Sequence, residues 1–182
     1  SITGAEQERW LLDGLRRSDA RWDILGQQVF FAQRDTLAGP DKRLSMDAWD
    51  GYSANRDRVT RGLRDARNAV VLTGDVHTHW AADLKENYDD PGSATVGSEL
   101  VCSSITSGGD GRDTPSGTHA FLQINPHLKF HNNQRGYVLT SITPERLAAD
   151  FRVVPYVSTP GAPVHTRASF VIENGRPALE RS

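Results

Sequence analysis

Residues 69–84, AVVLTGDVHTHWAADL, place an apolar run directly before an aspartate, two histidines and a tryptophan. A short apolar run that follows an amphipathic helix and ends at a glycine is typical of a central strand covered on both faces, as parallel strands are. In an extended chain, residues two apart point the same way, so we expect Asp75 and His77 to project together from the carboxyl end of this strand. Open α/β sheets place their ligand crevice at that end.

The segments before this strand predict an α/β unit. Thr3 and Glu6 stand at capping-box spacing ahead of an apolar stripe, and Ser53 is placed to cap a second helix whose arginines are expected to face solvent. Strand formers dominate residues 21–32, which contain no proline. The expected elements are helices over 3–15 and 54–67, a strand over 21–32 and a long loop over 33–52.

The segments after it are rich in strands. A Gly-rich loop over 108–117 has no spacing typical of phosphate-binding loops, and Asn174-Gly175 predicts a hairpin with a type I′ turn. The expected strands cover 95–107, 136–142 and 147–153, with a final hairpin over 168–180. The order of elements predicts one mixed α/β domain rather than a helical bundle or a pure β-sandwich.

Composition excludes several classes of protein. The 182 residues include 21 Lys and Arg against 23 Asp and Glu, and a net charge of -2 favours neither nucleic acid nor an anionic membrane as partner. Cys102 is the only cysteine, so no disulfide can form within the chain. No segment approaches the length of a transmembrane helix, and the absence of an initiator Met suggests that Ser1 is not the native start.

A carboxylate beside an imidazole suits a borderline cation such as Zn, Mn or Fe. The same pair also occurs as a hydrogen-bonded contact or a strand-end cap. If the strand continued, His79 would join Asp75 and His77 in the two-histidine, one-carboxylate set of non-haem iron oxygenases. A metal pair needs more donors, and Asp47, Asp50, Glu99 and Asn132 have no spacing that commits them to this role.

Several motifs together resemble one family. GDVHTHWAADL is similar to the C-terminal metal motif of the alkaline phosphatase D family, a branch of the calcineurin-like metallophosphatases. Four further stretches fall in the order and character expected of that family's C-terminal half, so that the resemblance covers most of the chain. They are GAEQERWLLDGLRRSDARWDILGQQVFFA, DAWDGYSANRDRV, SELVCSSITS and NNQRGYVLTSITPE.

The resemblance implies a four-layer α/β/β/α sandwich with a binuclear metal centre at the carboxyl ends of strands. It implies Asp75 and His77 as metal ligands, iron with calcium as the metals (Zn or Mn as alternatives), a phosphate ester as substrate, and a secreted or periplasmic location. The family commonly has a small polar residue at the position of His79. The predicted substrate-side residues are His79, Asn132, Asn133 and Arg135.

Family members have their first metal-binding motifs upstream of the segment that starts here at residue 4. We therefore interpret residues 1–182 as the C-terminal part of a single metallophosphatase-like domain, whose N-terminal half is a covalent or separate partner. The predicted function is hydrolysis of phosphomonoesters or phosphodiesters. The alternative is a non-catalytic, β-rich binding or assembly module that needs a complementary chain.

Overall fold

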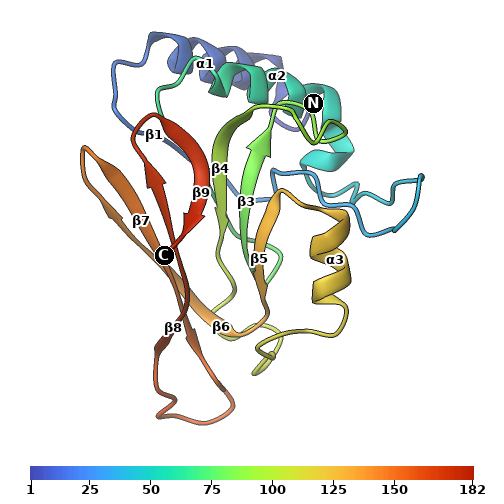
Figure 1. Ribbon diagram of the computed structural model, residues 1–182, viewed down its shortest axis with the longest axis vertical. Coiled ribbons are helices and arrows are strands. Elements are labelled where there is room, and N and C mark those ends of the chain that lie inside the picture. Colours follow the sequence, from blue (N-terminus) through green and yellow to red (C-terminus); the bar gives the residue numbers. More distant parts are fainter.

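The computed structural model describes all of residues 1–182 and arranges them as two packed β-sheets with helices beside the first sheet (Figure 1). The first sheet has the strand order β1-β2-β4-β3-β5, in which β1, β2 and β4 are parallel and β3 runs antiparallel to both of its neighbours. Its strands are β1 (Asp23–Gly26), β2 (Ala69–Thr73), β3 (His79–Lys85), β4 (Thr95–Val101) and β5 (Leu128–Asn132).

This topology determines which chain segments meet at one edge of the sheet. The carboxyl ends of β2, β4 and β5 lie at the same edge as the start of β3, since Trp80 is paired with both Val101 and His131. The central strand predicted from its apolar run is β2, which is buried along almost its whole length. The segment after it therefore lies at the expected ligand-binding edge.

The second sheet is an antiparallel meander in the order β6-β7-β8-β9. Its strands are β6 (Arg135–Ile142), β7 (Arg146–Val154), β8 (His165–Glu173) and β9 (Arg176–Arg181). Alternate residues of β7 and β8 are buried, as expected for strands with one face on a core. Phe151 and Phe170 pack against Phe130 of the first sheet, so the two sheets share an apolar core.

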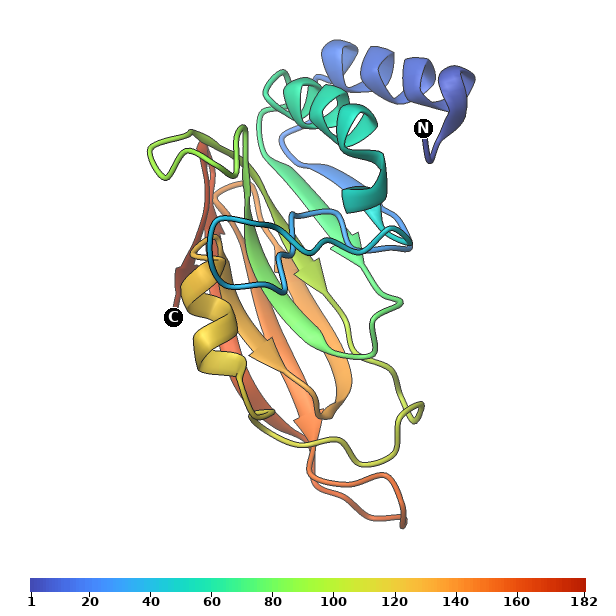
Figure 2. The same cartoon turned by 90° about the vertical axis from the view of Figure 1, so that its right-hand side faces the viewer.

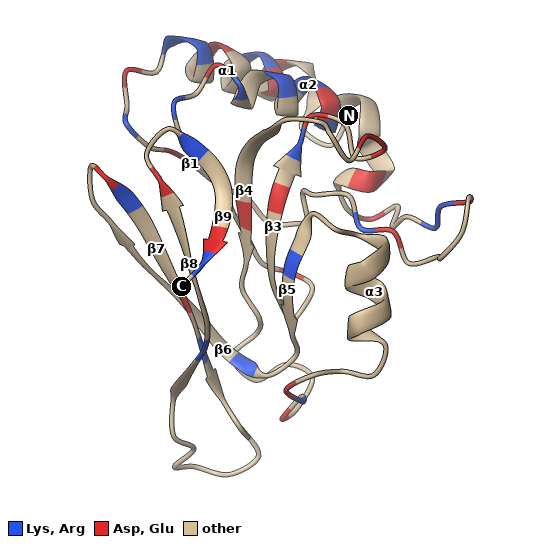
Figure 3. Ribbon diagram, in the orientation of Figure 1, with Lys and Arg blue, Asp and Glu red and all other residues tan.

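Helices α1 (Gly4–Arg17) and α2 (Ser53–Leu63) cover the other face of the first sheet (Figure 2). They approach closely at Gly62, where a Cβ would lie 2.5 Å from a methyl group of Leu12. A short 3-10 helix, η1 (Trp49–Tyr52), leads into α2, and α3 (Thr118–Ile124) lies beside β5. Basic and acidic residues are interspersed over α1 and α2 (Figure 3).

The predicted caps were right in part. Thr3 is the N-cap residue of α1, but its hydroxyl donates to the Asn55 side chain and makes no cap hydrogen bond. The predicted cap Ser53 is instead the first residue of α2. Arg56 of α2 is buried, not solvated, because it forms an ion pair with Asp50. These side chains follow tertiary contacts rather than the local pattern.

Several predicted boundaries were also wrong. The strand expected over 21–32 ends at Gly26, and β4 ends at Val101. The final hairpin is present, but positive φ occurs at Gly175 alone, so its turn is not type I′. The class was predicted correctly: helices, a mixed sheet and an antiparallel sheet form successive layers of an α/β fold. No helix is long and apolar enough to span a bilayer.

Candidate metal site

The loop 74–78, which joins β2 to β3, has an unusual backbone conformation. Asp75 has φ 69° and His77 has φ 54°, and these are the only residues other than glycine with positive φ. The left-handed region costs a non-glycine residue on the order of 1 kcal/mol, and such strain clusters at functional sites. The two side chains are therefore presented by a strained loop and not by the extended strand from which we predicted their common direction.

Both candidate metal ligands have free side-chain donors. Asp75 and His77 are exposed, and neither side chain makes a hydrogen bond or an ion pair with another residue. A carboxylate and an imidazole are donors suited to Fe, Zn or Mn. The chain contains no group of three or more His, Cys, Asp or Glu residues that could hold a metal. The residues present thus fit part of a metal site and supply two donors.

The loop backbone is fixed from three directions. The carbonyl oxygen of His77 accepts a hydrogen bond from the Ser103 hydroxyl at 3.1 Å and another from the Asn133 amide at 3.3 Å. The amide of Gly74 donates to the carbonyl of Gln28 at 3.1 Å. These contacts come from segments far apart in the sequence, and they oppose relaxation of the strained loop.

His79 is the first residue of β3 and is fully buried, unlike Asp75 and His77. The Ser103 amide donates to its Nδ1 at 3.1 Å, and its ring packs edge-to-face on Phe151 with 5.4 Å between centroids. Burial, with a smaller effect from Arg135, lowers its pKa to about 4. The strand does not continue from β2 through residue 79, so the condition for a three-residue set with Asp75 and His77 is not met. His79 instead supports the site from the interior.

Glu99 of β4 forms a buried support that the sequence did not reveal. Its carboxylate accepts hydrogen bonds from the amides of Phe31 and Ala32, both at 2.8 Å, and from the Thr73 hydroxyl at 2.6 Å. Burial raises the pKa of Glu99, and these hydrogen bonds act in the opposite direction. Because Thr73 ends β2, Glu99 fastens residues 31–32 to the strand that leads into the ligand loop.

The remaining predicted substrate-side residues lie where β5 ends and β6 begins, and Asn132 and Arg135 contact a second loop, 102–117. Asn132 is buried and its amide donates to the carbonyl and carboxylate oxygens of Asp113 at 2.7 and 2.9 Å. Arg135 is 1% exposed and its guanidinium binds Ser104, Ser107 and the Asn133 carbonyl. Of the four, Asn133 alone contacts the ligand loop through its side chain. A substrate contact by any of them stays a prediction.

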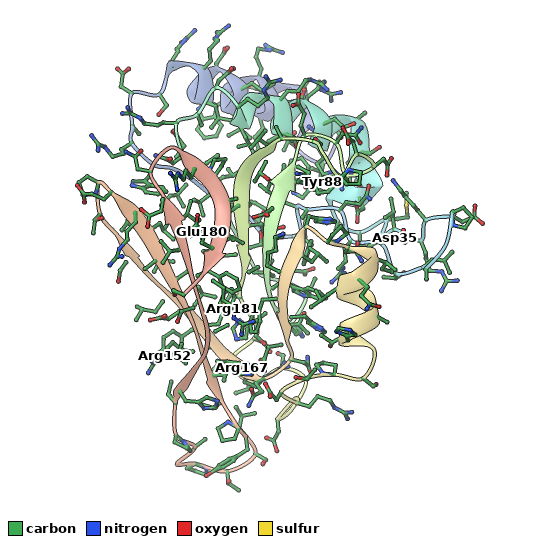
Figure 4. All side chains as sticks on the ribbon, viewed as in Figure 1. Asp35, Tyr88, Arg152, Arg167, Glu180 and Arg181 are labelled. Atoms are coloured by element: carbon green, nitrogen blue, oxygen red, sulfur yellow. The ribbon has the colours of Figure 1, made fainter.

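The same loop is also tied to the second sheet. Asp113 forms an ion pair with Arg167 of β8, which Figure 4 places on the lower half of that sheet. Asp110 accepts hydrogen bonds from the amides of Val157 and Ser158 at 2.7 and 2.8 Å. Gly111 packs so closely on the Asn133 carbonyl that a Cβ would come within 1.9 Å of its oxygen. The loop therefore has a fixed position beside the candidate ligands.

The fold brings the strained Asp-x-His loop, with two possible metal donors, to the carboxyl edge of the first sheet. The family model described as PhoD-like phosphatase matches residues 1–151, and the chain belongs to this family. The predicted resemblance is thereby confirmed.

Among characterised relatives, alkaline phosphatase D of Bacillus subtilis (strain 168) is 44% identical over 183 residues, which covers 100% of this chain and 31% of that protein. A solved structure described as "Structure of PhoD" superposes with a TM-score of 0.93 at 44% identity, covering 98% of this chain and 34% of that one. The chain thus spans about a third of the length of the relatives that it matches.

Proposed function

We propose that the complete protein is a metal-dependent phosphoester hydrolase in which Asp75 and His77 are ligands of a binuclear metal centre. The main support concerns the two residues of loop 74–78 that have strained backbones and exposed, unpaired side chains. They are the same two residues that the family motif implies as ligands. Such strain persists only where the surrounding structure holds it, as Ser103 and Asn133 do here.

The bound metals would supply a nucleophilic water at neutral pH and neutralise charge on the phosphoryl oxygens. Asp75 and His77 would hold and orient the metals, while Ser103 and Asn133 fix the loop that bears them. Iron with calcium is the proposed pair, with Zn or Mn as alternatives that the donor types also permit. Phosphomonoesters and phosphodiesters are both proposed substrate classes.

The chain covers 31% and 34% of its longer relatives, and we propose that the missing donors lie in a part of the domain upstream of this chain, as the family resemblance implies. The free edge of β1 has room for that part. A groove of about 460 Å³ between α1 and β1 is lined in part by Trp10, Ile24 and Trp49, and Trp10 is 71% exposed. An upstream strand added to β1 would cover this apolar edge, which is a liability when it stays open. A secreted or periplasmic location is proposed from the family alone.

The test is His77→Ala in the complete protein, with His165→Ala as control, since His165 is exposed on β8 and far along the chain from the loop. Metal content by elemental analysis and hydrolysis of phenyl phosphate are measured together. We expect His77→Ala to lose about one metal equivalent and at least 1000-fold in turnover, because a metal ligand is removed. Retention of metal and turnover by His77→Ala would refute the ligand assignment.

A chelator separates the proposal from the alternative of a binding module. Under the proposal, chelation abolishes hydrolysis and re-addition of metal restores it. A binding or assembly module would show no hydrolysis before chelation, and its association state would not respond to the chelator.

A further inference from the structure

Arg34 is a desolvated cation without an anionic partner. Its guanidinium forms no hydrogen bond or ion pair with the protein, and only its backbone amide binds the Asp50 carboxylate, at 3.0 Å. The guanidinium carbon lies 4.8 Å from the ring centroid of Phe30 and 5.8 Å from that of Trp80. Cation–π contacts therefore fix its position and leave its N–H donors free.

Burial lowers the pKa of Arg34, and the carboxylates of Asp50, Glu99 and Asp75 act against this effect. Asp50 already binds Arg56, and Glu99 already accepts three hydrogen bonds. The charge of Arg34 therefore has electrostatic support but no direct counter-ion within the chain.

The guanidinium borders a cavity of about 320 Å³ at the edge of the first sheet that also carries loop 74–78. The lining includes Trp80, which stacks on His131 with 3.8 Å between ring centroids. Thr36, Ser116 and Thr118 also line the cavity, and the Thr118 hydroxyl is within hydrogen-bond distance of His131 Nδ1, at 2.9 Å. The lining includes one cation and no carboxylate, a composition that favours an anion.

The cavity adjoins the ligand loop without being part of it. Trp80 is three residues beyond His77, at the paired ends of β3 and β5, yet no residue of 74–78 lines the cavity. A group bound by Arg34 would therefore lie beside, and not on, metals held by Asp75 and His77. The volume also exceeds the needs of one phosphate and leaves room for the organic part that bears it.

We propose that this cavity is a substrate subsite in which Arg34 binds a second anionic group, a phosphate on the alcohol portion of the ester remote from the bond that is cleaved. This inference rests on the proposed hydrolase function. It predicts that doubly phosphorylated substrates are preferred, and that the preference depends on Arg34.

The test compares 1,3-propanediol bisphosphate with 1,3-propanediol monophosphate as substrates of the complete, metal-loaded protein. Arg34→Met retains the packing on Phe30 and Trp80 but removes the charge, and Arg34→Lys retains the charge but removes the planar fork. We expect Arg34→Met to lower kcat/KM for the bisphosphate at least tenfold and to change the monophosphate value less than twofold. Arg34→Lys should lie between wild type and Arg34→Met.

Arg17→Met is the matched control, because Arg17 is exposed on α1 and forms no ion pair. It should leave both substrates unchanged, and circular dichroism should show that each variant folds. An equal fall for both substrates would assign Arg34 to the cleaved phosphoryl group and overturn the subsite. No fall for either substrate would overturn it as well.

A second measurement separates the subsite from the hydrolase proposal. If the wild-type protein hydrolyses neither monoester, the bisphosphate is titrated calorimetrically into the metal-free complete protein, and the proposed function fails only if bis(4-nitrophenyl) phosphate, a diester, also stays intact. Binding that Arg34→Met weakens at least tenfold would support the anion subsite. Equal binding by wild type and Arg34→Met, or none by wild type, would refute it.

Discussion

The ligand loop 74–78 and the buried cluster around Glu99 lie at the same end of the same sheet, yet their polar groups differ in exposure and in hydrogen bonding. Asp75 and His77 are exposed, strained and unpaired, whereas Glu99 is fully buried and accepts three hydrogen bonds. Thr73 connects the two regions, because it binds Glu99 and stands one residue before the loop begins.

This contrast separates the residues proposed to meet a metal or substrate from the residues that stabilise the fold around them. Residues that meet a metal or substrate must keep their donors free, and the backbone strain around them must be balanced by contacts elsewhere. Buried polar groups stabilise only when they are fully paired, since an unpaired one costs its desolvation energy. Substitutions in the two regions should therefore change different quantities.

Glu99→Gln should give the largest change in stability. An amide group cannot accept hydrogen bonds at both positions where the carboxylate accepts the amides of Phe31 and Ala32, so one donor stays buried and unpaired. We expect the free energy of unfolding to fall by about 3 to 5 kcal/mol, as when a buried charged network is broken. Urea denaturation of the metal-free complete protein measures this change.

The exposed Glu145→Gln serves as its control, since Glu145 lies in the turn between β6 and β7 and its side chain has no partner. It should change the free energy of unfolding by less than about 0.5 kcal/mol. Equal effects of the two substitutions would mean that the Glu99 cluster contributes no special support.

Acid should lower the free energy of unfolding through the buried histidine His127. The His127 Nε2–H donates to the Gln33 carbonyl at 2.6 Å, and burial is the main cause that lowers its pKa to about 4, with Lys129 and Arg56 adding to it and Asp83 opposing. Between about pH 6.5 and pH 4 the unfolded chain binds the proton and the folded chain does not. The contribution of neutral His127 to the free energy of unfolding is thus fully present above pH 6.5 and is lost as pH falls toward 4.

His127→Gln keeps a donor for the Gln33 carbonyl but does not titrate. It should therefore reduce the loss of unfolding free energy between pH 7 and pH 4.5, by at most about 3 kcal/mol because one pKa unit corresponds to about 1.4 kcal/mol. Urea midpoints across that range measure the difference. His165→Gln on the exposed end of β8 should leave the profile unchanged, and a matching change there would contradict the assignment to His127.

The same contrast explains what the sequence could predict. Asp75 and His77 could be predicted as strand-end residues because an apolar strand and a glycine directly precede them in the sequence. Their role as metal ligands stays a prediction. Glu99 and Arg34 could not be assigned, since Glu99 meets Phe31 across 68 positions and the cavity of Arg34 is completed by β3, β5 and the loop before α3. The cap hydrogen bond predicted at Thr3 is absent for the same reason, because the hydroxyl donates to Asn55, which is 52 positions along the chain.

The smallest predicted effect isolates the strain in the ligand loop. His77→Ala and His77→Gly both remove the imidazole and should lose turnover alike, but only glycine adopts positive φ without steric cost. We therefore expect His77→Gly to be more stable than His77→Ala by about 1 kcal/mol. At Glu145, where φ is not positive, Glu145→Ala should be more stable than Glu145→Gly, because glycine there only increases the conformational entropy of the unfolded chain. If alanine were the more stable substitution at both positions, the loop would store no strain, and the backbone support for the proposed metal site would be lost.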